Sequence, residues 1–314
     1  MDVPLHFEDS DESTEDYENL VPTVNVSRSI LLDRNPIDYL LPDVSRYTFK
    51  TWDQIFPKHI DLLTLIFDKE WKLFLAGIRS KNYFNQIESD LADCKDSIVP
   101  PPELLFNSLN TCSLENVKVV IMGQDPFINT TKINGKEIAQ AMGLSFSVCK
   151  GYKKPPSLNN IFDNLVKYEH LDSVPNKGCL SGWALQGVLL LNASLTTTKG
   201  KSNAHKNIWK EFTEDLISYI NDHTANVVFL VWGKDANNIC KNVDPNKHKL
   251  ITSSHPSPYS CDKPVQGLEY GSVKFEAKRK TISYKPFSKV DHFGKANKYL
   301  RSVDKTPILW DIIV

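Results

Sequence analysis

Residues 117–127 read VKVVIMGQDPF, and this stretch decides the fold of the 314-residue chain. Its first half, Val117–Met122, is a short apolar run rich in β-branched residues, which predicts a strand. From Gly123 onward the stretch is polar and turn-forming, so the strand is expected to end there. A strand that is apolar on both faces must be covered on both sides, which is typical of the parallel sheets of α/β proteins.

Similar short runs recur further along the chain and alternate with helical patterns. The candidate strands are Leu144–Val148, Val188–Leu191, Val227–Trp232 and Lys249–Ser253, and the intervening helices include Ser157–Tyr168 and Asn207–Asn221. Alternating strands and helices predict an α/β fold. We expect a three-layer α/β/α sandwich around a central, largely parallel four-stranded sheet.

The chain is expected to divide into a tail and one domain. Residues 1–20 carry eight acidic side chains and no Lys or Arg, and residues 1–45 lack apolar periodicity, so they predict a flexible acidic tail. From Trp52 to Phe84 apolar residues recur at helical spacing, which indicates helices packed on a core. The remaining residues, 46–314, are long enough to form one enzyme-sized domain.

Charge and cysteine content limit the possible classes of protein. The net charge is −1, yet residues 241–314 hold 14 Lys or Arg against seven Asp or Glu. This basic region fits a phosphate-rich partner, and a solvated lysine-rich surface explains it equally well. The six cysteines are scattered without CxxC spacing, which argues against a zinc site or disulfide framework and for a reducing compartment. No apolar run is long enough for a membrane span, so we expect a soluble intracellular protein.

Polar segments follow four of the predicted strands. They are Gly123-Gln124-Asp125-Pro126-Phe127, Asn192-Ala193, Gly233-Lys234 and His255-Pro256-Ser257-Pro258-Tyr259. Ligands of parallel sheets bind outside the carboxyl ends of the strands. An Asp, an Asn and a His at one rim could supply a water-positioning carboxylate, an amide reader and a hydrogen-bond donor. Singly, each is also an ordinary structural residue of a turn or strand end.

These motifs, in this order, resemble those of the family 1 uracil-DNA glycosylases over about residues 52–314. The matching blocks are Val99–Pro102, Val117–Phe127, Leu144–Val148, Lys154–Ile161, Gly178–Thr196, Ser202–His205, Phe229–Gly233, Ser254–Ser257 and His292–Asn297. The resemblance implies a monofunctional glycosylase that flips uracil out of single- or double-stranded DNA and hydrolyses its N-glycosidic bond. It implies base excision repair as the process, and no metal or organic cofactor.

The resemblance also assigns roles around the base. Phe146, otherwise an ordinary core residue, would stack on uracil, and Asn192 would read its edge because an amide offers both a donor and an acceptor. Phe127 would exclude the methyl group of thymine at C5. Gln124 would contribute a backbone N–H to the base.

Catalysis is assigned to two of the rim residues. His255 would donate a hydrogen bond to uracil O2 as a neutral imidazole, and Asp125 would position the attacking water and stabilise the sugar cation.

DNA contacts are assigned to the loops around these groups. Ser157, Ser257 and the position after Gly233, here Lys234, would contact the flanking phosphates, while Tyr259 would fill the gap left by the flipped base. Ser157 is equally a candidate N-cap of the helix that follows it.

Four residues depart from the family pattern. Phe127 stands where tyrosine is usual, Ile128 replaces a histidine, Lys234 replaces a serine and Tyr259 replaces a leucine. Lys234 would increase the salt dependence of DNA binding.

Two segments are longer than is usual in the family. One is Ile128–Met142, which extends the loop after Asp125. The other is an insertion at about residues 261–291, in which Ser272–Ala277 and Thr281–Phe287 predict a hairpin around Lys278-Arg279-Lys280 that lies beside DNA.

Two alternatives remain at this point: a catalytically weak or inactive DNA-binding or replication scaffold on the same fold, and a glycosylase for another damaged pyrimidine. For the main interpretation we expect a monomer, a possible proteinaceous inhibitor as a partner, and a location in the nucleus, or the host nucleus for a viral protein.

Overall fold

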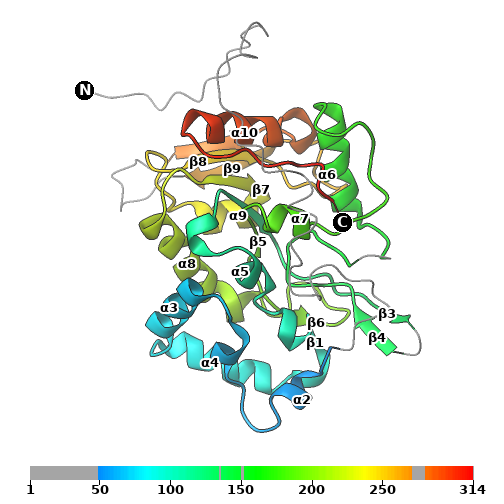
Figure 1. Cartoon of the computed structure of the whole chain (residues 1–314), viewed down its shortest axis with the longest axis vertical. Helices are drawn as coiled ribbons and strands as arrows, with labels where there is room; N and C mark the ends of the chain where they lie inside the picture. The colour runs from blue at the N-terminus through cyan, green and yellow to red at the C-terminus, as the bar shows by residue number, and fades with distance from the viewer. Residues whose placement is uncertain (1–48, 134–135, 150–151, 271–279, 314) are drawn as a thin grey trace, which may run out of the picture.

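The computed structural model describes residues 49–133, 136–149, 152–270 and 280–313. Figure 1 shows a central sheet with helices packed around it. The predicted tail, residues 1–45, lies outside the described residues. The helices of four or more residues are α2 Trp52–Ile55, η2 Leu62–Leu65, α3 Lys69–Ile78, α4 Asn82–Ala92, α5 Asn107–Thr111, α6 Pro156–Lys167, α7 Ser181–Ala184, α8 Lys206–His223, α9 Gly233–Cys240 and α10 His292–Ser302.

Four strands form the central sheet, in the order β5-β2-β7-β8. Their bounds are β5 Val188–Asn192, β2 Val119–Gly123, β7 Val228–Trp232 and β8 Lys249–Ser253. Every neighbouring pair is parallel, so all four carboxyl ends lie at one edge. The pairing of Gly123 with Asn192, and of Trp232 with Ser253, brings the loops after the strands to the same level.

Alternate side chains of the strands enter two separate cores. On β2, Val120 and Met122 pack in one core with residues of α3, α4 and α8, whereas Val119 and Ile121 pack in the other with residues of α6, α7 and α10. Because successive strand residues point to opposite faces, each face needs its own helical layer. The predicted three-layer α/β/α sandwich is therefore confirmed. Figure 1 shows α10 and α6 at the opposite end of the molecule from α3 and α4.

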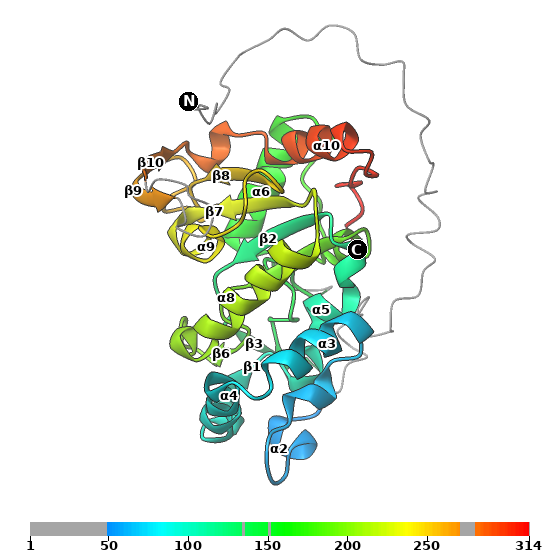
Figure 2. The same ribbon diagram turned by 90° about the vertical axis from the view of Figure 1, so that its left-hand side faces the viewer.

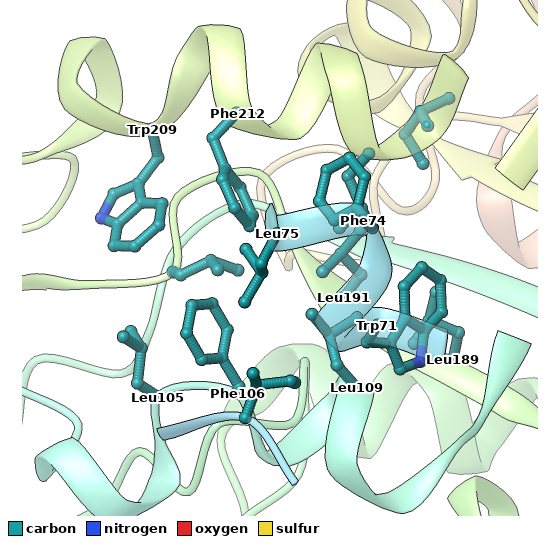
Figure 3. Packing of buried hydrophobic residues seen from close by; sticks show 14 of the residues in the cluster. Trp71, Phe74, Leu75, Leu105, Phe106, Leu109, Leu189, Leu191, Trp209 and Phe212 are labelled. Carbon is teal, nitrogen blue, oxygen red and sulfur yellow. The ribbon is translucent and has the colours of Figure 1, made fainter. Parts of the chain in front are cut away.

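The first core joins the N-terminal helices to α8. Phe74 and Phe106 both contact Phe212, with ring centroids 5.8 and 6.1 Å apart, and Trp209 lies beside the same ring (Figure 3). Figure 2 shows α8 running alongside the sheet. The helices predicted between Trp52 and Phe84 are thus present, and they cover one face of the sheet.

The strand predicted at Leu144–Val148 is wrong. These residues form turns, because Phe146 has a φ of 61° and Gly143 a φ of 72°, both in the left-handed region that interrupts extended chain. The other predicted strands are present, and Lys249–Ser253 has the predicted bounds.

Both long segments contain a hairpin. In the loop after Asp125, β3 Thr130–Ile133 pairs with β4 Lys136–Ala139. In the 261–291 insertion, β9 Val265–Tyr270 pairs with β10 Lys280–Tyr284. The second hairpin confirms the predicted element, but its first strand precedes the predicted Ser272–Ala277, which lies outside the described residues together with Lys278 and Arg279.

Shorter elements complete the chain. Strands β1 Ile98–Val99 and β6 Thr197–Thr198 form a small antiparallel pair. The three-residue 3-10 helices are η3 Lys95–Ser97, η4 Pro102–Leu104, η5 Leu114–Asn116 and η7 Phe287–Lys289.

Candidate active site

The carboxyl edge of the sheet brings Asn192 against the end of β2. A Cβ atom added to Gly123 would lie 2.3 Å from Asn192 Oδ1 and 2.7 Å from Ser145 Cβ. Position 123 therefore requires glycine, because any other residue would displace the asparagine side chain. Asn192 is 8% exposed, so its amide is almost buried at the rim.

Phe146 and His255 meet at the same edge. Their ring centroids lie 5.9 Å apart, and Phe146 also contacts Trp232, at 5.5 Å and an angle of 61°. Phe146 is 8% exposed, so its ring is packed on the core while retaining an accessible part. Phe146 has a left-handed backbone conformation, which differs from the extended conformation of the predicted strand.

The ring of His255 is held in one orientation by its own loop. The backbone N–H of Ser257 donates to His255 Nδ1 at 3.0 Å. A neutral imidazole whose Nδ1 accepts carries its proton on Nε2. Burial lowers the pKa of His255 to about 4, against a smaller opposing effect of Asp235. The residue is therefore neutral near pH 7 and can donate a hydrogen bond through Nε2–H.

Side chains also close the loop that carries His255. The hydroxyl of Ser260 donates to the carbonyl of His255 at 2.9 Å and lies 2.9 Å from the hydroxyl of Ser257. Asn160 of α6 donates through Nδ2 to the carbonyl of Pro256 at 2.8 Å. Tyr259 projects from this loop and is 86% exposed.

Asp125 follows β2 and is partly exposed. Its Oδ2 accepts hydrogen bonds from Ser202 Oγ at 2.9 Å and from the backbone N–H of Asn203 at 2.6 Å. Sequence reasoning gave these two residues no role, although they lie in one of the matching blocks. The loop itself is tied to the end of β5, because Ser194 N donates to the carbonyl of Gln124 at 3.0 Å.

A pocket of about 90 Å³ lies between the ends of β2 and β7. Gln124, Gly233, Lys234 and His255 contribute to its walls, whereas Asp125, Phe146 and Asn192 do not. The predicted residues thus share one edge, but only Gln124 and His255 of the base-binding and catalytic set line this pocket. Gly233 has a φ of 85°, and a Cβ there would lie 2.9 Å from His255 Cβ.

Three other predicted contact residues lie around this edge. Lys234 is exposed in the first turn of α9, and Phe127 is partly buried against the second core. Ser157 is partly exposed in α6, but the interpretation as an N-cap is wrong. Pro155 occupies the cap position and Pro156 starts the helix, because proline's fixed φ suits a first turn.

In the described parts of the chain, no group of three or more His, Cys, Asp or Glu residues is arranged to hold a metal ion. None of the helices within the described ranges is both long and apolar enough to cross a membrane. None of the six cysteines, all of which the structure describes, forms a disulfide.

The chain is similar in sequence to known uracil-DNA glycosylases. Residues 109–273 match the model of the uracil DNA glycosylase superfamily. The probable uracil-DNA glycosylase of Acanthamoeba polyphaga mimivirus is 43% identical over 279 residues, which are 88% of this chain and 73% of that protein. The uracil-DNA glycosylase of Pseudomonas aeruginosa strain UCBPP-PA14 is 39% identical over 249 residues, 78% of this chain and 94% of its own length.

Solved structures agree. The crystal structure of mimivirus uracil-DNA glycosylase superposes with a TM-score of 0.82 at 43% identity, covering 88% of this chain and 98% of that one. A variant of the mimivirus protein in complex with UGI matches with the same TM-score, over 87% of this chain. With identity of this level over most of both chains, the protein belongs to the uracil-DNA glycosylase family.

Proposed function

We propose that this protein is a monofunctional uracil-DNA glycosylase, which hydrolyses the bond between uracil and deoxyribose in DNA. The observation that carries the proposal is that His255 and Asp125 both lie at the carboxyl edge of the sheet. His255 is neutral and has no acceptor for Nε2–H among the described residues, while Asp125 is an oriented carboxylate. Membership of the glycosylase family supports the same reaction.

The base is proposed to bind against Phe146. An aromatic face is suited to stack on a flipped base, and the almost buried amide of Asn192 can match the donor and acceptor at the uracil edge. Phe127 would lie at uracil C5 and leave no room for a methyl group. Gln124, which lines the pocket, would donate its backbone N–H to the base.

In the proposed reaction, negative charge develops on uracil and positive charge on the sugar as the glycosidic bond breaks. As the glycosidic bond breaks, its electron pair leaves with uracil, and the donor at His255 Nε2 stabilises the negative charge at O2. The sugar becomes cation-like at C1′, where the Asp125 carboxylate stabilises it and orients the attacking water. The water oxygen bonds to C1′ and its proton passes to the Asp125 carboxylate and then to solvent, while the uracil anion takes up a proton from solvent, giving uracil and an abasic site.

DNA is proposed to lie across the same edge. Ser157 and Ser257 would contact phosphates beside the flipped nucleotide, and Gly233 would allow the backbone to approach another phosphate closely. Lys234 adds a cation at the start of α9, where the helix dipole already favours an anion. The exposed ring of Tyr259 would occupy the gap in the base stack.

Partners and location follow from the same proposal. The complex of the mimivirus relative with UGI supports a proteinaceous inhibitor of that kind for this chain as well. We further propose that the protein acts as a monomer in the nucleus, or in the host nucleus if its source is viral. Size-exclusion chromatography with light scattering, and localisation of a tagged chain, would test these two points.

The decisive experiment measures base release from labelled oligonucleotides that carry uracil, thymine or a 5-substituted uracil. The wild type should release uracil and leave thymine in place. Asp125→Asn and His255→Gln should each lower the rate by about 10²–10³ while DNA binding persists. DNA binding without release of any base would instead establish the scaffold alternative. Release of a 5-substituted base in preference to uracil would establish a glycosylase for another damaged pyrimidine.

A further inference from the structure

We propose that residues 197–205, hereafter the positioning segment, orient the Asp125 carboxylate for activation of the water. This inference rests on the proposed function and assigns a positioning role to Ser202 and Asn203. Both residues donate to the same oxygen, Oδ2, at 2.9 and 2.6 Å. The other oxygen, Oδ1, has no donor among the described residues, so it is the oxygen available to a water molecule.

The backbone of the positioning segment directs the N–H of Asn203 at the carboxylate. Asn203 has a φ of 58°, and Gly200 has a φ of 75°. Asparagine is one of the few residues that adopts this left-handed conformation at modest cost. The turn at Asn203 therefore presents its own N–H to Asp125, and the adjacent Ser202 hydroxyl reaches the same oxygen.

Internal bonds hold the positioning segment in shape. Thr197 Oγ1 donates to the carbonyl of Lys201 at 2.7 Å and accepts from the N–H of Ala204 at 3.2 Å. At the end of the segment His205 is 4% exposed, and its Nδ1 lies 2.8 Å from Thr196 Oγ1. Both ends are thus fixed, and the exposed turn between them has little freedom to move.

The positioning segment also contacts the rest of the Asp125 loop. Gly200 N–H donates to the carbonyl of Ile128 at 2.9 Å. Lys199 forms an ion pair with Glu137 of β4, which itself accepts from Thr130 of β3 at 2.7 Å. The segment therefore touches the loop at Asp125, at Ile128 and in the hairpin, which is the arrangement expected of a brace for the carboxylate.

The first test removes one donor. Ser202→Ala should lower the single-turnover rate of uracil release about five- to tenfold, because a hydrogen bond to a charged group is lost at a partly hydrated site. KM should change by less than about twofold, since the bond acts on the water and not on DNA. Ser202→Thr retains the hydroxyl and should restore most of the rate.

A matched control is available on α8. Ser218 is also exposed and also donates to a carboxylate, Asp222, at 3.5 Å, but it lies outside the positioning segment. Ser218→Ala should leave the rate unchanged. Thermal unfolding of both variants establishes that each remains folded.

The second test is a double-mutant cycle in the full chain, with excess enzyme so that slow variants can be measured. In an Asp125→Ala background, Ser202→Ala should have no further effect, because the carboxylate it orients is absent. An equal loss in both backgrounds, or a change confined to KM, would overturn the inference. If the wild type releases no uracil, the proposed function itself fails; an active wild type with an unaffected Ser202→Ala variant rejects only this inference.

Discussion

The loops that carry His255 and Asp125 face the same sheet edge but are organised differently. The His255 loop orients its imidazole with its own Ser257 N–H, and burial keeps the ring neutral. The Asp125 carboxylate is oriented by Ser202 and Asn203, which lie 77 and 78 residues further along the chain. The orientation of His255 is therefore set within its own loop, whereas that of Asp125 depends on a tertiary contact with a distant segment.

The largest effect expected from this difference is on stability in acid. Unfolded histidine binds a proton below about pH 6.5, whereas folded His255 stays neutral until about pH 4. The unfolded state thus binds more protons between these values, so the free energy of unfolding should fall as the pH drops through this window, by about 3 kcal/mol for His255.

Chemical denaturation of the wild type and His255→Gln at pH 7 and 4.5 measures this contribution. The variant should lose less stability on acidification, and the difference between the two proteins isolates His255 from other buried histidines such as His292. Histidine resonances followed by NMR would give the pKa directly. Titration of His255 near pH 6.5 would contradict the account of its loop.

The next largest effect is expected from a substitution that displaces His255 and leaves the Asp125 loop unchanged. In Gly233→Ala the new Cβ would lie 2.9 Å from His255 Cβ, at a φ of 85° that alanine tolerates poorly. We expect uracil release to fall about a hundredfold, since a displaced donor no longer reaches O2. Gly77→Ala on α3 is the matched control, because among the described residues no atom outside its chain neighbours and its own helix backbone lies within 4 Å of its Cβ position. Comparable activity of both variants would show that the loop adapts.

A smaller effect tests how independent the His255 loop is. Asn160→Ala removes the one side-chain bond described here that runs from α6 to this loop, the bond to the carbonyl of Pro256 at 2.8 Å. If the loop is largely self-sufficient, the rate should fall only about fivefold, the equivalent of one hydrogen bond. A loss as large as that of Gly233→Ala would mean that α6 positions His255 as much as its own loop does.

The smallest effect is expected from the exposed ion pair that joins the positioning segment to β4. Glu137→Gln removes the ion pair with Lys199. The side chain of Glu137 is 48% exposed and that of Lys199 is 43% exposed. Exposed pairs contribute little, so uracil release should fall by less than about twofold at low salt and by nothing measurable at high salt. An effect that persists in high salt would show that the hairpin orients Asp125 by packing and not by charge.

Much of this architecture could be predicted from the sequence, for physical reasons that also explain the errors. Three of the sheet strands, β2, β5 and β7, are buried on both faces, so their apolar runs mark them clearly, whereas the edge strand β8 is only partly buried. Leu144–Val148 is equally apolar, yet it turns because Gly143 and Phe146 adopt left-handed backbone, which hydrophobic pattern does not report. The residue type of Ser157 makes it a candidate cap as well as a phosphate contact, but Pro155 occupies the cap position and Pro156 starts the helix.

The site was predicted in part. Asp125 and His255 each follow a strand and Asn192 ends one, and parallel strands bring such residues to one edge. Ser202 and Asn203 left no comparable signal, because an exposed polar pair in a turn has no periodicity and its partner is distant in sequence. Contacts of this type become visible only when the chain is folded.

The order of the strands determines where the recess lies and which of the two long segments borders it. The first strand of the sheet, β2, pairs with the second, β5, on one side and with the third, β7, on the other. The chain leaves β2 in one direction and later crosses to its other flank, so the loops after β2 and β7 diverge and a crevice opens between them. The pocket beside Gln124 and Gly233 occupies this crevice. The strand order therefore places the recess between β2 and β7, and the hairpin of β3 and β4 lies in a loop that borders it, outside the four-stranded framework.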